Sequence, residues 1–451
     1  MRTATIITVG CKVNQYDSEA MAEILKDDGY DIVPYSADHP ADVYIINTCS
    51  VTNTSDGKSR QMIRRAASVN SDAVIVVAGC YSQVSTKDII NIEGVDIVLG
   101  TRRRDRVAIY IKEFLETGKR IIDVSENEDH LSDISMERFS VQGHEGHTRA
   151  YIKIEDGCGC FCSYCIVPYA RGPVRSRTPS DIAEEVGKLA FSGFKEIVVT
   201  GINLAAYGSD WNNINTTYRN DDIIPSLVVV LKKINEFKEI QRIRLGSLEP
   251  EAITSDFVSG IKNTGKLCPH FHMPLQSGCN ETLKRMNRKY TSEEYREKVE
   301  LLRSNFEDCA ISTDIMVGFP GETDSEFETT LKFVEEISFS RTHIFKYSRR
   351  AGTAAAEMTD QIPNPVKDLR SESLIGLSAE KSLVFHESLV GRIMPILVEN
   401  SISDGLFAGL TANYVPVEFM GENVPSGEIA DIELIKAFPD HIEGRTAFHN
   451  S

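Results

Sequence analysis

The sequence predicts an α/β protein made of three parts: an N-terminal parallel α/β (Rossmann-like) domain, a central partial (β/α)6 barrel of the triosephosphate isomerase type, and a small C-terminal β-barrel. Short β-branched runs alternate with helix-compatible stretches in the first third, and six more such pairs follow in the middle. The last segment holds only short strands with glycine-rich turns. The length of 451 residues agrees with about three domains of roughly 150 residues each.

The composition is that of an ordinary globular protein, with 41% hydrophobic and 25% charged residues. It excludes collagen-like, low-complexity and mostly disordered chains. The net charge of −17 argues against binding nucleic acid through overall charge, although a local basic patch stays open. No run approaches the roughly 18 apolar residues of a membrane span, and the first residues lack a leader pattern. We therefore expect a cytoplasmic protein with no membrane partner.

Three cysteines of the first third each follow a predicted strand. These strands are expected at residues 3–9, 42–48, 73–79 and 95–99, with helices at 17–27 and 57–69. Cys11 comes one residue after the first strand, and Cys49 and Cys80 directly follow the second and third. The carboxyl ends of parallel strands share the edge where ligands bind. Three thiolates there favour an iron–sulfur cluster with one open iron, or an open zinc site, over unrelated core cysteines.

A second cysteine group lies in the middle of the chain. Four of the ten cysteines fall within eight residues: Cys158, Cys160, Cys162 and Cys165. The spacing C-x3-C-x2-C allows three thiolates on one loop to bind three irons of a [4Fe–4S] cluster, leaving the fourth iron for a chelating ligand. A zinc knuckle normally needs a second Cys/His pair at similar spacing, and none is obvious. The role of Cys160 stays open, because spacing alone also allows a register that includes it.

The cysteine loop follows the first of six predicted barrel strands. We expect these strands at residues 149–154, 196–200, 242–245, 270–273, 311–317 and 342–347. A helix at 180–192 opens with Ser180 and Asp181 as its cap, and a helix at 291–303 opens with a capping box of Thr291 and Glu294. Each strand is followed by a polar or glycine-rich loop, and such loops build the active site of these barrels.

The last segment is acidic. Residues 368–390 read as a helix, and 392–445 as the short strands of the small β-barrel. Residues 392–451 hold three basic and nine acidic residues. Because phosphate contacts need lysine and arginine, this barrel is not expected to hold RNA by charge, and a purely structural role stays open.

Several motifs together resemble the radical S-adenosylmethionine (SAM) methylthiotransferases. Besides the cysteine loop, they are GCKVNQYDSE at 10–19, NTC at 47–49, GC at 79–80, CIVPYARG at 165–172, HMPLQSG at 272–278 and DIMVGFPGE at 314–322. The resemblance spans nearly the whole chain. The first motif is similar to the branch that acts on N6-threonylcarbamoyladenosine at position 37 of tRNA. The isopentenyladenosine and ribosomal-protein branches differ there.

The resemblance implies a methylthiotransferase domain at 1–125, a radical SAM core at 144–375 and a TRAM-like β-barrel at 376–447. Cys158, Cys162 and Cys165 would ligate the [4Fe–4S] cluster that binds SAM, and the three N-terminal cysteines would hold a second [4Fe–4S] cluster that carries the sulfur. The reaction would replace the hydrogen at C2 of the adenosine by a methylthio group. The implied partners are the anticodon stem-loop of tRNA, a reductant such as flavodoxin or ferredoxin, and a sulfur donor.

Two further sets of residues are candidates for binding. Six lie in or beside the strand-end loops, where SAM would bind: Tyr164, Thr200, Ser247, Glu249, Gln276 and Asp314. Six arginines are candidates for holding an RNA whose target base is turned out of its stack: Arg102, Arg103, Arg104, Arg175, Arg349 and Arg350.

Three alternatives compete with this interpretation. The same chemistry would act on isopentenyladenosine or on a ribosomal-protein aspartate. A radical SAM methyltransferase would use no sulfur, and its N-terminal cluster would be structural or carry electrons. A zinc-stabilised RNA-binding protein would be colourless and contain no acid-labile sulfide. The six strand-end loops weigh against this last alternative.

Overall fold

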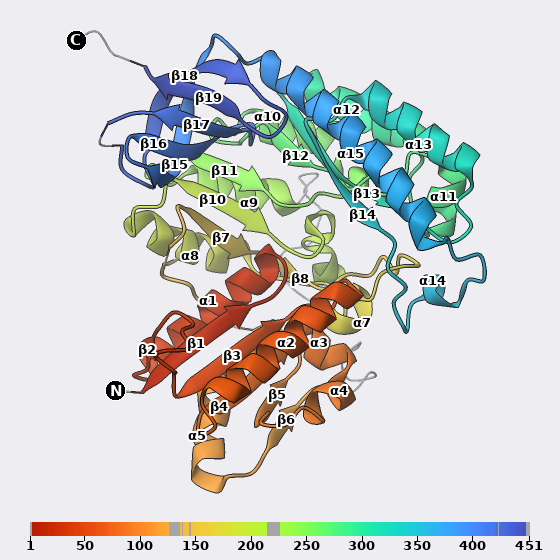
Figure 1. The fold of residues 1–451 in the computed structure, drawn as a ribbon. Helices are drawn as coiled ribbons and strands as arrows, with labels where there is room; N and C mark the ends of the chain where they lie inside the picture. The colour runs from red at the N-terminus through yellow and green to blue at the C-terminus, as the bar shows by residue number, and fades with distance from the viewer. Residues whose placement is uncertain are drawn as a thin grey trace.

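The computed structural model describes residues 2–125, 136–137, 139–143, 146–213, 226–422 and 424–447. An N-terminal sheet, a central half-barrel and a C-terminal closed barrel lie against one another (Figure 1). The described part of the chain has no helix that is both long and apolar enough to span a membrane.

The N-terminal sheet has six parallel strands in the order β2-β1-β3-β4-β5-β6. They are β1 (Thr3–Thr8), β2 (Asp31–Ile32), β3 (Val43–Thr48), β4 (Val74–Gly79), β5 (Ile97–Leu99) and β6 (Ile121–Asp123). Strands β1, β3, β4 and β5 confirm the four strands that the sequence predicts for this part of the chain. The short β2 and β6, which the sequence pattern missed, extend the sheet at its two edges.

Helices cover both faces of this sheet. They are α1 (Lys12–Asp27), α2 (Asn53–Val69), α3 (Cys80–Val84), α4 (Thr86–Ile90) and α5 (Val107–Thr117). The apolar side chains of α1 and α5 pack on one face, and those of α2 and α4 on the other, which confirms the Rossmann-like arrangement. α1 begins five residues before the predicted start, because its first turns bury polar side chains such as Asn14 and Asp17 and lack apolar periodicity.

The middle of the chain forms the predicted half-barrel of six parallel strands. They are β7 (Arg149–Lys153), β10 (Glu196–Thr200), β11 (Arg242–Leu245), β12 (His270–His272), β13 (Ala310–Val317) and β14 (Arg341–Lys346). A bridge between Ser247 and His272 joins two three-stranded sheets, and the N–H of Leu248 donates to the His272 carbonyl at 2.9 Å. β7 and β14 are the outer strands, so the barrel is partial.

Helices form the outer layer of the half-barrel (Figure 1). They include α8 (Pro179–Phe191), α9 (Ser226–Asn235), α10 (Ser255–Lys262), α11 (Asn280–Arg285), α12 (Ser292–Arg303) and α13 (Asp324–Ile337). Two short helices lie in loops, α7 (Val167–Arg171) after the cysteine loop and α14 (Ala354–Glu357) after β14. The capping box of Thr291 and Glu294 is confirmed. The predicted cap at Ser180 is wrong: Thr178 caps α8, because Pro179 takes the first helical position.

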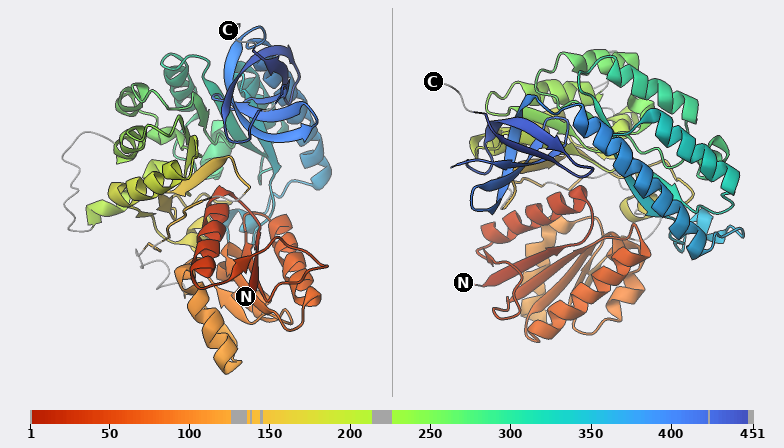
Figure 2. Two further views of the ribbon diagram at one scale, coloured as in Figure 1. Left: turned by 90° about the vertical axis from the view of Figure 1, so that its left-hand side faces the viewer. Right: turned by 45° about the horizontal axis from the view of Figure 1, so that its top comes forward.

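The C-terminal strands close into a ring (Figure 2). They are β15 (Ile393–Ser403), β16 (Leu406–Thr411), β17 (Pro416–Met420), β18 (Ile429–Ala437) and β19 (Ile442–Thr446), which confirms the small β-barrel. The expected boundary between residues 375 and 376 falls inside α15 (Asn364–Glu387). This helix joins the two barrels: its Ser382 hydroxyl donates to the Ser340 carbonyl, and its His386 ring contacts the Phe438 carbonyl at 2.6 Å.

The capping box gives a stability prediction. Thr291→Ala removes the hydroxyl that accepts the Glu294 N–H at 3.2 Å, and we expect the free energy of unfolding to fall by about 1 kcal/mol. The measurement is the shift of the urea midpoint at constant slope. Thr329→Ala, on the exposed face of α13, is the matched control and should stay within about 0.5 kcal/mol of the wild type. Equal shifts of the two variants would contradict the capping role.

Candidate active site

The fold brings the three N-terminal cysteines to one edge of the sheet. Cys11 caps α1 after β1, Cys49 follows β3, and Cys80 opens α3 after β4. Gly10 permits this approach, since its φ is +127° and a Cβ there would stand 2.7 Å from the Cβ of Cys49. Burial raises the pKa of Cys49 to about 11, and the neighbouring thiols of Cys80 and Cys11 add to the effect.

The four cysteines of the middle group lie on one loop after β8 (Glu155–Asp156), whose partner strand is β9 (Arg175–Ser176). Gly157 starts the loop at φ +97°, and a Cβ there would stand 2.0 Å from the Pro173 carbonyl oxygen. Backbone N–H groups donate to the sulfurs of Cys158, at 3.5 Å, and Cys165, at 3.4 Å. The guanidinium of Arg288 donates to Cys162 at 3.4 Å. Such N–H···S bonds suit thiolates, which are the form that binds metal.

Cys160 has different surroundings from the other three thiols of the loop. The Asn203 side-chain amide donates to its sulfur at 3.4 Å. A hydrogen bond with the Cys158 thiol lowers the pKa of Cys160 to about 7, whereas burial raises the pKa of Cys165 to about 12. All four sulfurs therefore accept an N–H group, and the hydrogen bonds alone do not single out three ligands.

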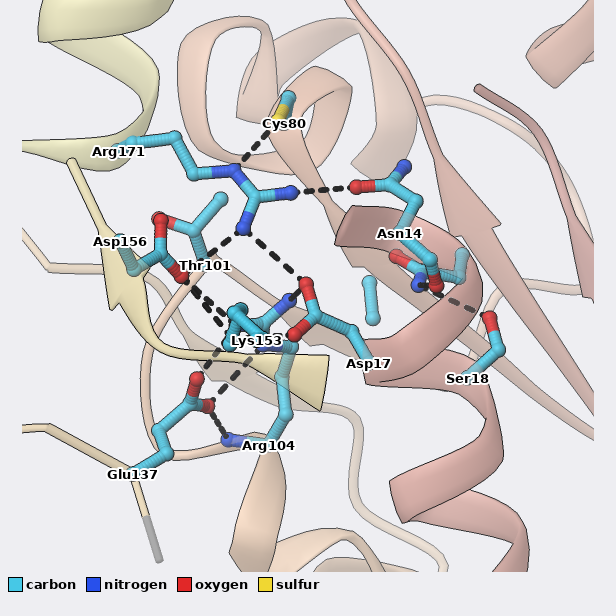
Figure 3. A network of polar contacts seen from close by, with 12 residues as sticks. Asn14, Asp17, Ser18, Cys80, Thr101, Arg104, Glu137, Lys153, Asp156 and Arg171 are labelled. Atoms are coloured by element: carbon cyan, nitrogen blue, oxygen red, sulfur yellow. Dashed lines mark hydrogen bonds and ion pairs between the residues drawn. The ribbon is translucent and has the colours of Figure 1, made fainter. Parts of the chain in front are cut away.

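Arg171 connects the two cysteine groups. It ends α7, the short helix that follows the cysteine loop, and its Nε donates to the Cys80 sulfur at 3.3 Å. Its two terminal nitrogens bind Asp17 at 3.1 Å, Asp156 at 3.0 Å and the Asn14 side-chain oxygen (Figure 3). A side chain of the half-barrel thus contacts a thiol of the N-terminal sheet.

Arg171 belongs to a buried network of ion pairs. Its members include Arg104, Lys153, Arg171 and Arg175 against Asp17, Glu137 and Asp156. Burial raises the pKa of the Cys80 thiol, and the guanidinium of Arg171 opposes that effect. Arg171 therefore stabilises the negative charge of a thiolate ligand at Cys80.

The chemistry of the thiols fits iron–sulfur clusters. Cysteine thiolates are the ligands of [4Fe–4S] clusters, and three of them leave one iron open. Each of the two sets includes a sulfur that accepts an N–H from an arginine, Arg288 for the loop and Arg171 for the N-terminal set. Across the described residues, no group of three or more cysteine, histidine or acidic side chains is arranged to hold a single metal ion.

Five of the six SAM candidates lie at the carboxyl ends of the barrel strands or in the loops that follow, and Asp314 lies within β13. Thr200 is buried, and the other five are half-buried. Glu249 forms an ion pair with Arg288, the residue that also donates to Cys162. Asp314 lies 3.3 Å from the His272 ring, and Gln276 adopts φ +66° beside it, donating its N–H to the Asp314 carbonyl at 2.8 Å.

Four of the six predicted RNA contacts are interior side chains, which the structure corrects. Arg104 is fully buried between Asp17 and Glu137, and Arg350 is ion-paired to Asp56 across the two α/β parts. Arg102 and Arg175 are also buried, at 4% and 3% exposure. Because their side chains are buried inside the protein, these four arginines do not reach an RNA phosphate. Only Arg103 and Arg349 are exposed.

The buried network gives a prediction on pH. Burial by itself raises the pKa of Asp17, but Arg104, Lys153 and Arg171 outweigh it and lower the pKa to about 2. Because the folded pKa lies below the unfolded value of about 3.9, this stabilisation is full above pH 5 and is lost as the pH falls towards 2. Between pH 7 and pH 3 we expect a loss of about 1 kcal/mol from Asp17, read from urea unfolding at pH 7, 5, 4 and 3.

Asp17→Asn should flatten this pH dependence by that amount, whatever its effect at pH 7. Asp38→Asn, at an exposed carboxylate, is the control and should keep the wild-type slope. An unchanged slope for Asp17→Asn would show that the network does not hold this charge.

Two family models match the two parts that supply the cysteines. Residues 3–100 match the Uncharacterized protein family UPF0004, and residues 152–334 match the Radical SAM superfamily. The first match contains the three N-terminal cysteines, and the second contains the cysteine loop.

Solved structures share the fold at low identity. The radical S-adenosylmethionine methyltransferase TsrM from Kitasatospora setae aligns with a TM-score of 0.58 and 15% identity, covering 79% of this chain and 77% of that one. The cobalamin-dependent S-adenosylmethionine radical enzyme OxsB aligns with a TM-score of 0.52 and 9% identity, covering 83% and 55%. These alignments confirm the pairing of an N-terminal α/β part with a radical SAM half-barrel.

Curated relatives match from end to end. The threonylcarbamoyladenosine tRNA methylthiotransferase MtaB of Bacillus subtilis is 38% identical, covering 99% of this chain and 96% of the relative. MtaB of Thermotoga maritima is 36% identical, covering 99% of both chains. A tRNA-2-methylthio-N(6)-dimethylallyladenosine synthase of Thermoanaerobacter pseudethanolicus is 37% identical, covering 95% and 89%. With two cysteine sets and relatives of this identity along its whole length, the chain belongs to the radical SAM tRNA methylthiotransferases.

Proposed function

We propose that this enzyme methylthiolates C2 of N6-threonylcarbamoyladenosine at position 37 of tRNA, giving 2-methylthio-N6-threonylcarbamoyladenosine. The observation that carries the proposal is the match to the two MtaB enzymes, which extends over 96% and 99% of their length. We infer a cytoplasmic location from the proposed tRNA substrate. The domains are the methylthiotransferase part at 1–125, the radical SAM core at 144–375 and the TRAM-like barrel at 376–447.

The cysteine sets fit two [4Fe–4S] clusters. When bound, the clusters and SAM supply the radical chemistry and the sulfur. Cys158, Cys162 and Cys165 would hold the cluster that binds SAM, and the three N-terminal cysteines would hold the other. Arg288 and Arg171 each donate an N–H to one sulfur of a set, which orients that ligand and stabilises its negative charge.

SAM would bind beside the first cluster, in the strand-end loops. Of the six candidates, Glu249 and Asp314 supply carboxylates and Ser247 supplies a hydroxyl. All three side chains are half-buried in the folded protein. Tyr164 packs edge-on against Phe319, which fixes its ring next to Cys165. These positions allow the half-barrel to orient SAM and to exclude water.

The tRNA would lie along a basic strip on α2. The solvent side of this helix holds Lys58, Arg64 and Arg65, and its one acidic residue, Asp56, is buried. The strip is continuous with Arg349, because the Asn53 side chain donates to the Arg349 carbonyl at 2.9 Å. Such contacts position a phosphate backbone without reading its bases. Arg103 adds a further exposed cation at the same domain.

Two further partners follow from the chemistry. Cleavage of SAM to a radical consumes an electron, so a reductant such as flavodoxin or ferredoxin is needed. Each turnover also consumes a sulfur atom, so a sulfur donor must restore it.

A second candidate substrate is N6-dimethylallyladenosine. The synthase of Thermoanaerobacter pseudethanolicus, at 37% identity, falls between the two MtaB enzymes, which are 38% and 36% identical to this chain. Its coverage is lower, at 95% of this chain and 89% of the relative, which favours the threonylcarbamoyl substrate.

Mass spectrometry of tRNA nucleosides tests the proposal. Cells that lack the gene should lose 2-methylthio-N6-threonylcarbamoyladenosine, and the wild-type gene should restore it. Cys11→Ala and Cys158→Ala should each fail to restore it, because each removes one proposed cluster ligand. Cys309→Ala, at a buried thiol outside both sets, is the matched control and should restore the nucleoside fully.

The same spectra separate the alternatives. Loss of the 2-methylthio form of dimethylallyladenosine alone would move the assignment to the second substrate. If no methylthio nucleoside changes, the tRNA assignment is wrong, and acid-labile sulfide in the anaerobically purified protein then measures whether the clusters are present.

A further inference from the structure

Side chains from three parts of the fold meet around the ring of Tyr414, in the turn between β16 and β17. Tyr414 has φ +71°, a left-handed conformation that a bulky residue adopts only when packing holds it there. The guanidinium carbons of Arg244 and Arg149 lie 4.6 and 5.5 Å from the ring centre, and the ammonium of Lys12 lies at 5.7 Å. The ring of His270 lies at 4.7 Å.

Lys12 is the cation in this group that lacks a counter-ion. Arg244 is bound to Glu196 at 2.7 Å, and Arg149 to Glu399 at 2.8 Å. The ammonium of Lys12 makes no ion pair and no hydrogen bond with any residue that the structure describes. Its contact with the Tyr414 ring leaves its three N–H donors free.

Lys12 lies between the two halves of the candidate active site. It follows Cys11 directly and is the first residue of α1, whose amino end adds a partial positive charge. The ring of His270, which packs on Tyr414 beside Lys12, and the ring of His272 both contact the Ser312 hydroxyl, at 2.9 and 3.0 Å. The His272 ring in turn lies 3.3 Å from Asp314. These contacts link the residues around Lys12 to the predicted SAM site.

Resting on the proposed function, we propose that Lys12 binds the threonyl carboxylate of the target nucleoside and thereby selects threonylcarbamoyladenosine over dimethylallyladenosine. The threonylcarbamoyl group ends in a carboxylate, which is ionised at neutral pH. The dimethylallyl group is a hydrocarbon and offers an ammonium nothing to bind. A base that lies between the two cysteine sets passes Lys12, whose exposed side chain can reach the carboxylate, and the hydrogen bond that forms is charge-assisted.

SAM is a second source of a carboxylate, through its methionyl part. A substitution of Lys12 lowers a different affinity depending on whether Lys12 binds the nucleoside carboxylate or the SAM carboxylate. Loss of the nucleoside carboxylate changes the affinity for RNA, whereas loss of the methionyl contact changes the affinity for SAM. An experiment that measures both affinities therefore separates them.

The test uses the full chain with both clusters reconstituted anaerobically. Fluorescent anticodon stem-loops carry threonylcarbamoyladenosine, its threonine amide or dimethylallyladenosine at position 37, and fluorescence anisotropy gives each Kd. The wild type should bind the carboxylate form about tenfold more tightly than the amide, the effect of one charged hydrogen bond. Lys12→Met should abolish this preference, and Lys12→Arg should keep most of it.

Lys58→Met, on the exposed face of α2, removes the same charge and should change all three affinities by the same factor. A tenfold preference that persists in Lys12→Met would overturn the proposal. So would a loss of SAM affinity, measured by equilibrium dialysis, that leaves the preference intact.

Failure of the proposed function is recognised separately. In that case the wild-type enzyme forms no methylthio product on the threonylcarbamoyl stem-loop, and the Lys12 proposal falls with it. If the wild type forms this product and Lys12→Met still discriminates, only the Lys12 proposal is wrong.

Discussion

The site depends on the pairing of buried charges between the N-terminal sheet and the half-barrel. Asp17 of the sheet accepts from Arg104 of its own part and from Arg171 and Lys153 of the half-barrel. Each of these charges costs several kcal/mol to bury unless its partner is in place. These ion pairs therefore hold the two parts against each other, and the two cysteine sets with them.

This pairing makes one site from residues that two separate parts supply. The segment that carries Cys165 continues into α7, and Arg171 at its end reaches Cys80 in the sheet. The short stretch from 165 to 171 is thus linked covalently to one set and by a hydrogen bond to the other. A methylthio transfer needs both cysteine sets to face the same base. The seven-residue stretch from Cys165 to Arg171 connects the two sets directly.

Hydrogen bonds and an ion pair hold the C-terminal barrel against the half-barrel, since Glu399 of β15 binds Arg149 at 2.8 Å. The guanidiniums of Arg242 and Arg244 donate to carbonyl oxygens of its strands, which seats the barrel at the half-barrel. The same seating brings Tyr414 into contact with Lys12 of the N-terminal part. An acidic barrel can therefore influence the active site without holding tRNA by basic residues.

The sequence by itself determined the three-part architecture, the order of the strands along the chain and the two cysteine sets. These depend on local patterns: β-branched runs, the capping box at Thr291 and cysteine spacing. Only the tertiary structure decided which basic residues are exposed. Arg350 resembles a surface cation in the sequence, yet its partner Asp56 lies 294 residues away and both are buried. A local pattern contains no information on such a partner, because the chain must fold before the two charges meet.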